Sequence, residues 1–173
     1  MTLKEDINDL DNSSGVYCIY DVDEKPAYVG KTTNGIKNRL RQHFISQTSS
    51  LIGHGRLDVW DVYYVEYWKT DNTDDAEKQL ISQLKPYLNL GGLGETHEVV
   101  NPNSPSGKLQ VISKEEAKSR KEPYNRAKQK ITHIDRMLDK IKKADHGEDV
   151  QKVLYEHLDL LEDNLDEFLD VKD

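Results

Sequence analysis

The chain of 173 residues is poor in cysteine, with Cys18 as the single one, and it lacks any long apolar run. A lone cysteine excludes an internal disulfide and is compatible with a reducing compartment. No segment approaches the ~20 apolar residues of a membrane-spanning helix, and no basic-then-apolar leader opens the sequence. We therefore expect a soluble, cytoplasmic protein with no membrane partner. Zinc-site spacing, zinc-finger motifs and helix-turn-helix motifs are also missing.

Hydrophobic residues are scarce as well, at 35% of the chain, whereas charged residues make up 32%. The formal net charge of −8 is unevenly distributed: residues 1–107 carry −6, residues 108–144 carry +7 and residues 145–173 carry −9. A basic segment thus lies between two acidic ones. Any contact with a polyanion must therefore be local.

The stretch 15–44 organises the rest of the chain. Residues 15–20 alternate in part, residues 21–26 are turn-forming, and residues 27–30 read as a return strand. A helix follows, and its apolar positions Ile36, Leu40 and Phe44 recur every four residues. The pattern predicts two paired strands with a helix packed against them.

Four polar side chains of this stretch should reach one surface. Tyr17 and Tyr28 come from the two strands, and Arg39 and His43 lie four residues apart on the flank of the helix. Arginine can hold a phosphate oxygen, and a water nucleophile needs a base. From the residues alone, the base is Tyr17, if nearby cations lower its pKa, or His43, which needs little perturbation.

Glu77 falls inside the apolar stripe of a second predicted helix, from about residue 73 to residue 85. The stripe comprises Ala76, Leu80, Ile81 and Leu84. An unpaired carboxylate on an apolar face costs several kcal/mol, so something must compensate it. An ion pair with a lysine or arginine and a divalent metal are equally compatible with the spacing. One hard carboxylate with water and phosphate oxygens suits Mg²⁺ or Mn²⁺.

These residues together resemble the GIY-YIG nuclease family. Gly15-Val16-Tyr17 and Tyr28-Val29-Gly30 are similar to its two strand motifs, and Lys31, Arg39, His43 and Glu77 follow in the family's order. Lys85-Pro86-Tyr87-Leu88-Asn89 is similar to its closing Pro-x-x-Asn element. The resemblance covers roughly residues 13–92. It implies an α+β domain with a three-stranded, mostly antiparallel sheet flanked by helices.

The resemblance also implies an activity and a set of roles. It implies DNA as the substrate, phosphodiester hydrolysis as the reaction, and one Mg²⁺ or Mn²⁺ ion on Glu77 as the cofactor. Tyr17 would be the base or would position the water, with Tyr28 assisting and His43 in a supporting role. Asn89 would brace the site. The expected catalytic residues are Tyr17, Tyr28, Arg39, His43 and Glu77, and the expected substrate contacts are Gly30, Lys31, Lys37, Arg41, Arg56 and Asn89.

The remainder of this half is expected to be scaffold. Residues 57–68 are rich in β-branched and aromatic residues and predict the longest strand, with aromatics that favour packing over base stacking. Residues 93–113 have linker composition, within which Glu98–Val100 could add a short edge strand. We place the nuclease-like domain at 1–92 and a helical domain at 114–173.

The C-terminal segment has helical periodicity. Apolar residues spaced three and four apart predict a heptad seam made by Tyr124, Ala127, Ile131, Ile134, Leu138 and Ile141. Residues 144–147 predict a turn, and a second, acidic helix follows. We expect an antiparallel hairpin whose basic and acidic arms attract each other. Two other interpretations stay open: a DNA-backbone stripe made by Lys114, Lys118, Arg120, Lys121, Arg126, Lys128 and Lys130, and pairing of the seam with another protomer.

Two functions are compatible with these observations. The first is a metal-dependent DNA endonuclease, and the second is a nucleic-acid-binding or regulatory protein that keeps the scaffold without cutting. The first depends on Glu77 and Arg39 meeting the two phenols in one pocket. A Glu77 already paired with a lysine, with no room for an ion, would count against it.

Overall fold

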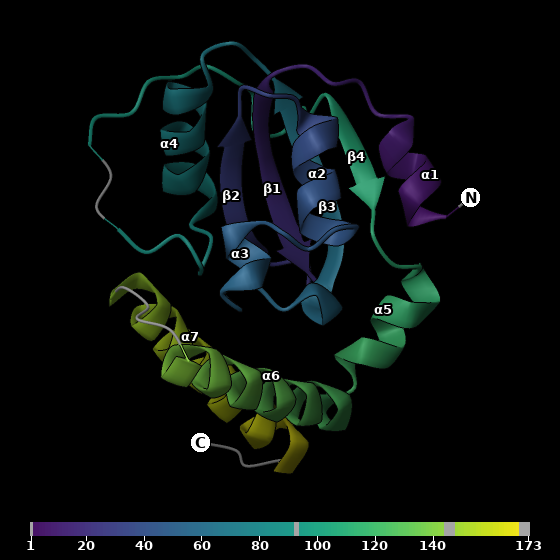
Figure 1. Cartoon of the computed structure of the whole chain (residues 1–173), viewed down its shortest axis with the longest axis vertical. Coiled ribbons are helices and arrows are strands. Elements are labelled where there is room, and N and C mark those ends of the chain that lie inside the picture. Colours follow the sequence, from purple (N-terminus) through teal and green to yellow (C-terminus); the bar gives the residue numbers. More distant parts are fainter. Residues whose placement is uncertain (1, 92–93, 144–147, 170–173) are drawn as a thin grey trace.

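The computed structural model describes residues 2–91, 94–143 and 148–169. At its centre is a four-stranded antiparallel sheet in the order β2-β1-β3-β4 (Figure 1). The strands are β1 (Gly15–Asp21), β2 (Pro26–Thr32), β3 (Val62–Lys69) and β4 (Gly107–Gln110). The α+β class is confirmed, although the sheet has four strands where we expected three.

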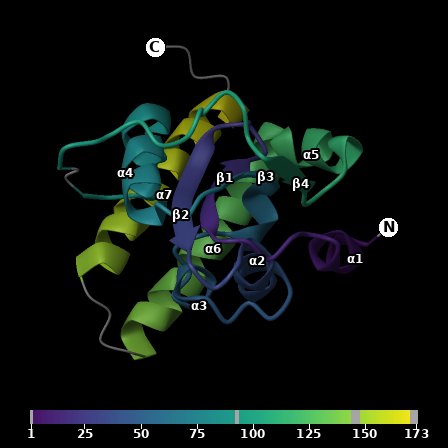
Figure 2. The same cartoon turned by 90° about the horizontal axis from the view of Figure 1, so that it is seen from above.

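Helices cover both faces of this sheet (Figures 1 and 2). On one face α4 (Thr73–Leu84) packs against β1 and β2. The other face is covered by α1 (Leu3–Asn8), α2 (Ile36–Phe44) and the short α3 (Ser50–Gly53). The alternation of β1 produces this division, because Val16 and Cys18 pack with the α4 side whereas Tyr17 and Ile19 pack with the α2 side.

Two strand predictions were wrong in detail. Residues 59–61 form a 3₁₀ turn, η1 (Val59–Asp61), because the Asp58 side chain accepts the backbone N–H of Trp60 at 3.1 Å. The strand therefore begins at Val62. Glu98–Val100 is not a strand; instead the Gln79 side chain accepts the Val99 and Val100 N–H groups at 2.7 and 3.0 Å. The edge of β3 is paired by β4, which lies within the segment we predicted as linker.

Three helices follow the sheet: α5 (Lys114–Lys121), α6 (Pro123–Lys143) and α7 (Glu148–Leu169). The start of α6 meets the end of α7, where the rings of Tyr124 and Phe168 lie 5.6 Å apart, and His133 meets His157 near the middle. These pairings make the two helices antiparallel, as expected for a hairpin. The predicted turn at 144–147 lies outside the described residues. None of the helices in the described ranges is long and apolar enough to cross a membrane.

The hairpin is attached to the sheet domain through buried ion pairs. Lys130, 1% exposed, donates to Asp61 at 2.5 Å, and Arg126 pairs with Asp23 in the β1–β2 turn. His157 of α7 donates from Nε2 to the carbonyl of Arg56 at 2.9 Å. The buried cations of the basic arm thus pair with the sheet domain rather than with α7, and Arg126 and Lys130 cannot belong to an exposed DNA stripe.

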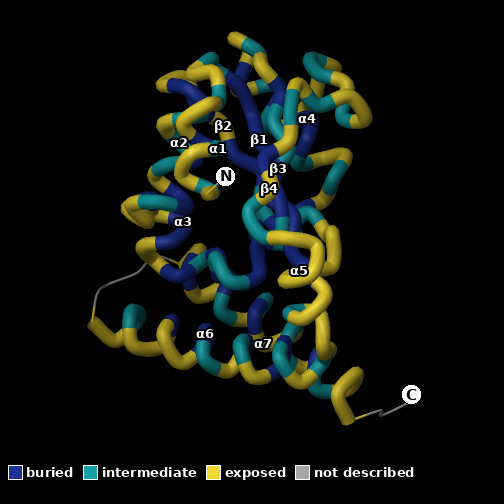
Figure 3. Tube along the Cα trace, turned by 90° about the vertical axis from the view of Figure 1, so that its right-hand side faces the viewer, coloured by how far each residue is buried: buried dark blue, intermediate teal, exposed yellow. Residues whose placement is uncertain are grey.

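Figure 3 shows how burial is distributed along the chain. Strand β1 is wholly buried and the edge strand β4 is mostly exposed, whereas the hairpin buries one side and exposes the other. Among the strand aromatics, Tyr64 and Trp68 are 7% and 2% exposed. These two side chains are packing residues, as the sequence favoured.

Candidate active site

The two strand motifs lie side by side because β1 and β2 are antiparallel. Tyr17 is paired with Gly30, and the Tyr17 and Tyr28 rings have centroids 6.4 Å apart. A Cβ atom on Gly30 would lie 2.5 Å from the Tyr17 hydroxyl and 2.8 Å from the Tyr28 ring. Gly30 therefore serves the site by leaving room for both phenols.

Helix α2 brings two polar side chains to Tyr17. Arg39 Nε donates to the Tyr17 hydroxyl at 3.3 Å, and His43 Nε2 lies 2.7 Å from the same oxygen. On its other side, His43 Nδ1 lies 2.8 Å from the hydroxyl oxygen of Ser49. Ser49 is the N-cap residue of α3 and accepts the Ile52 N–H. The result is a chain of contacts from Arg39 through Tyr17 and His43 to Ser49.

Burial determines the protonation states of Tyr17 and His43. It raises the pKa of Tyr17 above its ordinary value, and it lowers the pKa of His43 to about 3. The phenol is therefore protonated and the imidazole neutral at pH 7. A buried hydroxyl needs an acceptor, so Tyr17 donates to Nε2 and the ring proton sits on Nδ1, facing Ser49. The lowered phenol pKa that a Tyr17 base requires is absent here.

Tyr28 lies in a different environment. Its side chain is only partly buried, whereas Tyr17 is fully buried. Burial raises the pKa of Tyr28, and the positive charges of Arg56, Arg39 and Lys31 oppose that rise. Of the two phenols, Tyr28 is the one that solvent reaches and that cations surround.

Glu77 is paired with a lysine in this structure. Lys31 Nζ lies 2.8 Å from the Glu77 carboxylate and 2.7 Å from that of Asp74. Of the two alternatives for Glu77, an ion pair or a metal ligand, the structure shows the ion pair. The metal role stays a prediction. The side chains of Lys31 and Asp74 are 41% and 75% exposed, so the pair opens toward solvent.

The donor set here fits a hard divalent cation. Asp74 and Glu77 lie one helical turn apart on α4, and both contact one positively charged nitrogen. Their two carboxylates already hold the ammonium group of Lys31 between them, and that group lies at the end of a flexible, partly exposed side chain. Within the described ranges, no group of three His, Cys, Asp or Glu side chains could enclose a metal. Such a site suits Mg²⁺ or Mn²⁺, which keep several water or phosphate ligands.

The expected substrate contacts divide into two groups. Lys31 lines a hollow of about 370 Å³ together with Asp74 and with Arg39, one of the expected catalytic residues. Arg56 does not line this hollow, although its positive charge opposes the rise in the pKa of Tyr28. Arg41, by contrast, reaches Asn8 of α1. Lys37 lies one turn before Arg41 on that flank of α2 and is not brought to the tyrosines.

Asn89 holds the backbone of the second motif, Tyr28-Val29-Gly30, through two hydrogen bonds. Its side-chain amide donates to the Val29 carbonyl at 2.9 Å and accepts the Val29 N–H at 2.8 Å. Both backbone groups lie between Tyr28 and Gly30. The geometry fits the bracing role that the resemblance implied.

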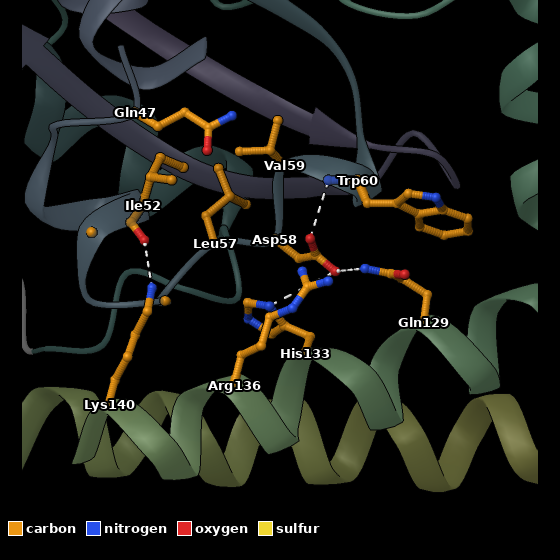
Figure 4. A pocket seen from close by; sticks show the side chains of 12 residues that line it. Gln47, Ile52, Leu57, Asp58, Val59, Trp60, Gln129, His133, Arg136 and Lys140 are labelled. Carbon is orange, nitrogen blue, oxygen red and sulfur yellow. Dashed lines mark hydrogen bonds and ion pairs between the residues drawn. The ribbon is translucent and has the colours of Figure 1, made fainter. Parts of the chain in front are cut away.

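A separate hollow of about 400 Å³ lies between α6 and the segment from α3 to η1 (Figure 4). Its polar groups pair with one another: Asp58 accepts Gln129 at 2.8 Å, and His133 lies 3.8 Å away from the same carboxylate. Lys140 donates to the Ile52 carbonyl at 3.2 Å. This hollow marks where the hairpin is anchored, and it lies apart from the tyrosines.

Sequence reasoning missed two residues of the site. Asp74 precedes Glu77 by three residues, and this helical spacing was the available signal. Ser49 lay in a segment treated as a solvated loop, and only its position before a short apolar run marked it as a helix cap.

Paired strands bring two tyrosines to an arginine and a histidine in the centre of a small α+β domain, and the second strand also holds an acidic helix through Lys31. Residues 13–89 match the family model described as the GIY-YIG catalytic domain. This part of the chain is therefore a GIY-YIG domain, and the resemblance found in the sequence is confirmed.

The chain is similar to several proteins named UvrABC system protein C. The protein from Caldicellulosiruptor saccharolyticus is 37% identical over 93 residues, which cover 52% of this chain and 15% of the relative. Those from Helicobacter pylori strain P12 and Prochlorococcus marinus are each 31% identical, covering 51% of this chain and 16% and 14% of the relatives. This chain thus spans only a small part of their length. No solved structure matches it significantly.

Proposed function

We propose that this protein is a metal-dependent DNA endonuclease that hydrolyses phosphodiester bonds in the cleft around Tyr17 and Tyr28. One observation carries the proposal: Arg39 and His43 contact Tyr17, the Tyr28 ring lies next to Tyr17, and Lys31 of the same strand as Tyr28 holds Glu77. The family match and the similarity to UvrABC system protein C support a nuclease acting on DNA.

In the proposed mechanism, Tyr28 takes the proton of the attacking water. It is the more solvent-accessible phenol. Burial and the charge of Glu77 raise its pKa in this structure, the charges of Arg56, Arg39 and Lys31 oppose that rise, and a divalent ion bound at Glu77 would lower the pKa. Tyr17 stays protonated. Its role is to orient Arg39 through their hydrogen bond, so that the guanidinium meets a phosphate oxygen. Ser49 is a positioning residue that fixes the His43 tautomer.

Glu77 and Asp74 would hold the divalent ion. When bound, it supplies positive charge that stabilises the leaving oxygen. The pair between Lys31 and Glu77 does not prevent this, because part-exposed ion pairs contribute only ~0–1 kcal/mol. Lys31 would then turn from the carboxylates to a phosphate oxygen of the DNA.

The test is incubation of supercoiled DNA with the full chain and Mg²⁺ or Mn²⁺. We expect nicking that Glu77→Ala and Arg39→Ala abolish, while Glu98→Ala, at an exposed acid outside the cleft, leaves it intact. Tyr28→Phe should remove most activity, and Tyr17→Phe should weaken it. Equal nicking by Tyr28→Phe and the parent would overturn the assignment of the base.

The alternative is a DNA-binding protein that keeps the scaffold without cutting, which would result if the Lys31–Glu77 pair stayed closed to metal ions. It predicts uncut DNA together with binding that is unchanged by chelation of the metal. Calorimetric titration with Mn²⁺ separates the two functions. A nuclease should bind Mn²⁺ and lose that binding in Glu77→Gln, whereas the second candidate should bind none.

A further inference from the structure

The predicted heptad seam of α6 is only half covered. Ala127 and Ile134 are buried at 4% and 9% exposure, as a packed seam requires. Tyr124, Ile131 and Leu138 are 54%, 53% and 51% exposed. These three residues recur every seven positions, so they form one row along the helix.

This row faces away from the sheet domain. The residues that anchor α6 to the domain, Arg126, Lys130, His133 and Met137, are all nearly fully buried. At 3.6 residues per turn, the exposed row lies roughly 130° around the helix from these anchors. The sheet domain therefore cannot cover it.

Helix α7 continues the same apolar face. Its Leu158 and Phe168 are 39% and 46% exposed, and the Phe168 ring contacts Tyr124 across the two helices. Figures 1 and 3 show the hairpin with one side toward the sheet domain and the other toward solvent. Contiguous exposed apolar residues on two packed helices are typical of an interaction surface. We call this surface, made of Tyr124, Ile131, Leu138, Leu158 and Phe168, the outer face.

The charges flanking the outer face select the partner. Arg126 and Lys130 are buried and paired with the sheet domain; without them α6 carries a net +3, and α7 carries a net −7. A DNA backbone or an anionic membrane would be repelled by α7. In a two-fold pair, each α6 can lie on the α7 of the other copy, so that every basic helix meets an acidic one.

We propose that the outer face joins two copies of this chain in an antiparallel four-helix bundle. Helices of 21 and 22 residues side by side present a surface of ~30 by ~20 Å, or ~600 Å² per copy. That is somewhat below the ~800 Å² per partner of a standard stable interface. Contacts of this size are typical of weak, transient association, so the dimer should dissociate on dilution and weaken as salt rises.

The experiment is sedimentation equilibrium of the full chain over a range of concentrations. The monomer mass is 19.9 kDa, and we expect the mean mass to rise toward twice that value as the protein concentration increases. Ile131→Glu and Leu158→Glu, one on each helix, should each raise the dissociation constant at least tenfold. Thr132→Glu, its neighbour turned away from the outer face, should leave it unchanged. Circular dichroism reports whether each variant is folded.

A monomer at every concentration would overturn the proposal, as would a dimer that both face variants leave intact. Loss of the dimer in Thr132→Glu as well would also count against it. The readout is mass and does not depend on nuclease activity. Failure of the proposed function and failure of this contact are thus distinguishable.

Discussion

Mild acid should destabilise this protein, because two of its histidines are buried in the neutral form. His43 and His157 are 0% and 2% exposed, and burial lowers the pKa of each to about 3. In the unfolded chain a histidine titrates near about 6.5. Since the folded pKa is the lower one, the unfolded state takes up protons first. Stability is complete above about pH 6.5 and falls progressively as the pH drops toward 3.

The size of the effect follows from these values. Going from about pH 7.0 to about pH 5.5 should cost about 1.3 kcal/mol for each histidine, or ~2.5 kcal/mol for the pair. The pKa of His133 is also lowered, chiefly by burial, and acts in the same direction. Domains of this size have total stabilities of only ~5–15 kcal/mol, so the loss is readily measured.

The assay is urea unfolding at the two pH values, followed by the fluorescence of Trp60 and Trp68. His157→Gln keeps a donor for the Arg56 carbonyl but cannot be protonated, so it should lose about half of the pH dependence. His97→Gln removes an exposed histidine and should lose none. Equal stability of the parent at both pH values, or a full pH dependence in His157→Gln, would refute the reasoning.

Three further predictions concern stability, and urea unfolding measures each. Lys130→Met leaves Asp61 buried without a partner and should cost ~3–5 kcal/mol, whereas adding Asp61→Asn should recover much of that loss. Gly30→Ala places a methyl group against the Tyr17 hydroxyl and should cost ~1–3 kcal/mol; an unchanged midpoint would contradict the close packing. Asn89→Ala removes two hydrogen bonds to the β2 backbone and should also cost ~1–3 kcal/mol, with Asn103→Ala in an exposed loop as the neutral comparison.

The periodicity of apolar residues was enough to predict most helices and strands of the GIY-YIG domain. Helix α2 was predictable because Ile36, Leu40 and Phe44 follow the helical period, and all three are buried as expected. The two faces of β1 followed from its alternation. These features depend on neighbours in the sequence, and the sequence displays them directly.

What escaped prediction depends on contacts between distant residues. Lys31 and Glu77 are 46 positions apart, and no spacing rule states that they will pair. The short β4 has few strand-forming residues and exists because β3 offers it an unpaired edge. Lys130 lies on a helix rich in lysine, where charges normally face water; only its partner Asp61 explains its burial.

The position of β4 also bears on how this protein can be shortened. Trimming it to the family-matched segment would remove the strand that pairs with Tyr64–Tyr67 and the histidine that holds the carbonyl of Arg56. Bare strand edges recruit other chains, so the trimmed protein should aggregate where the full chain does not. The Arg56 carbonyl would also lose the hydrogen bond that ties its loop to α7.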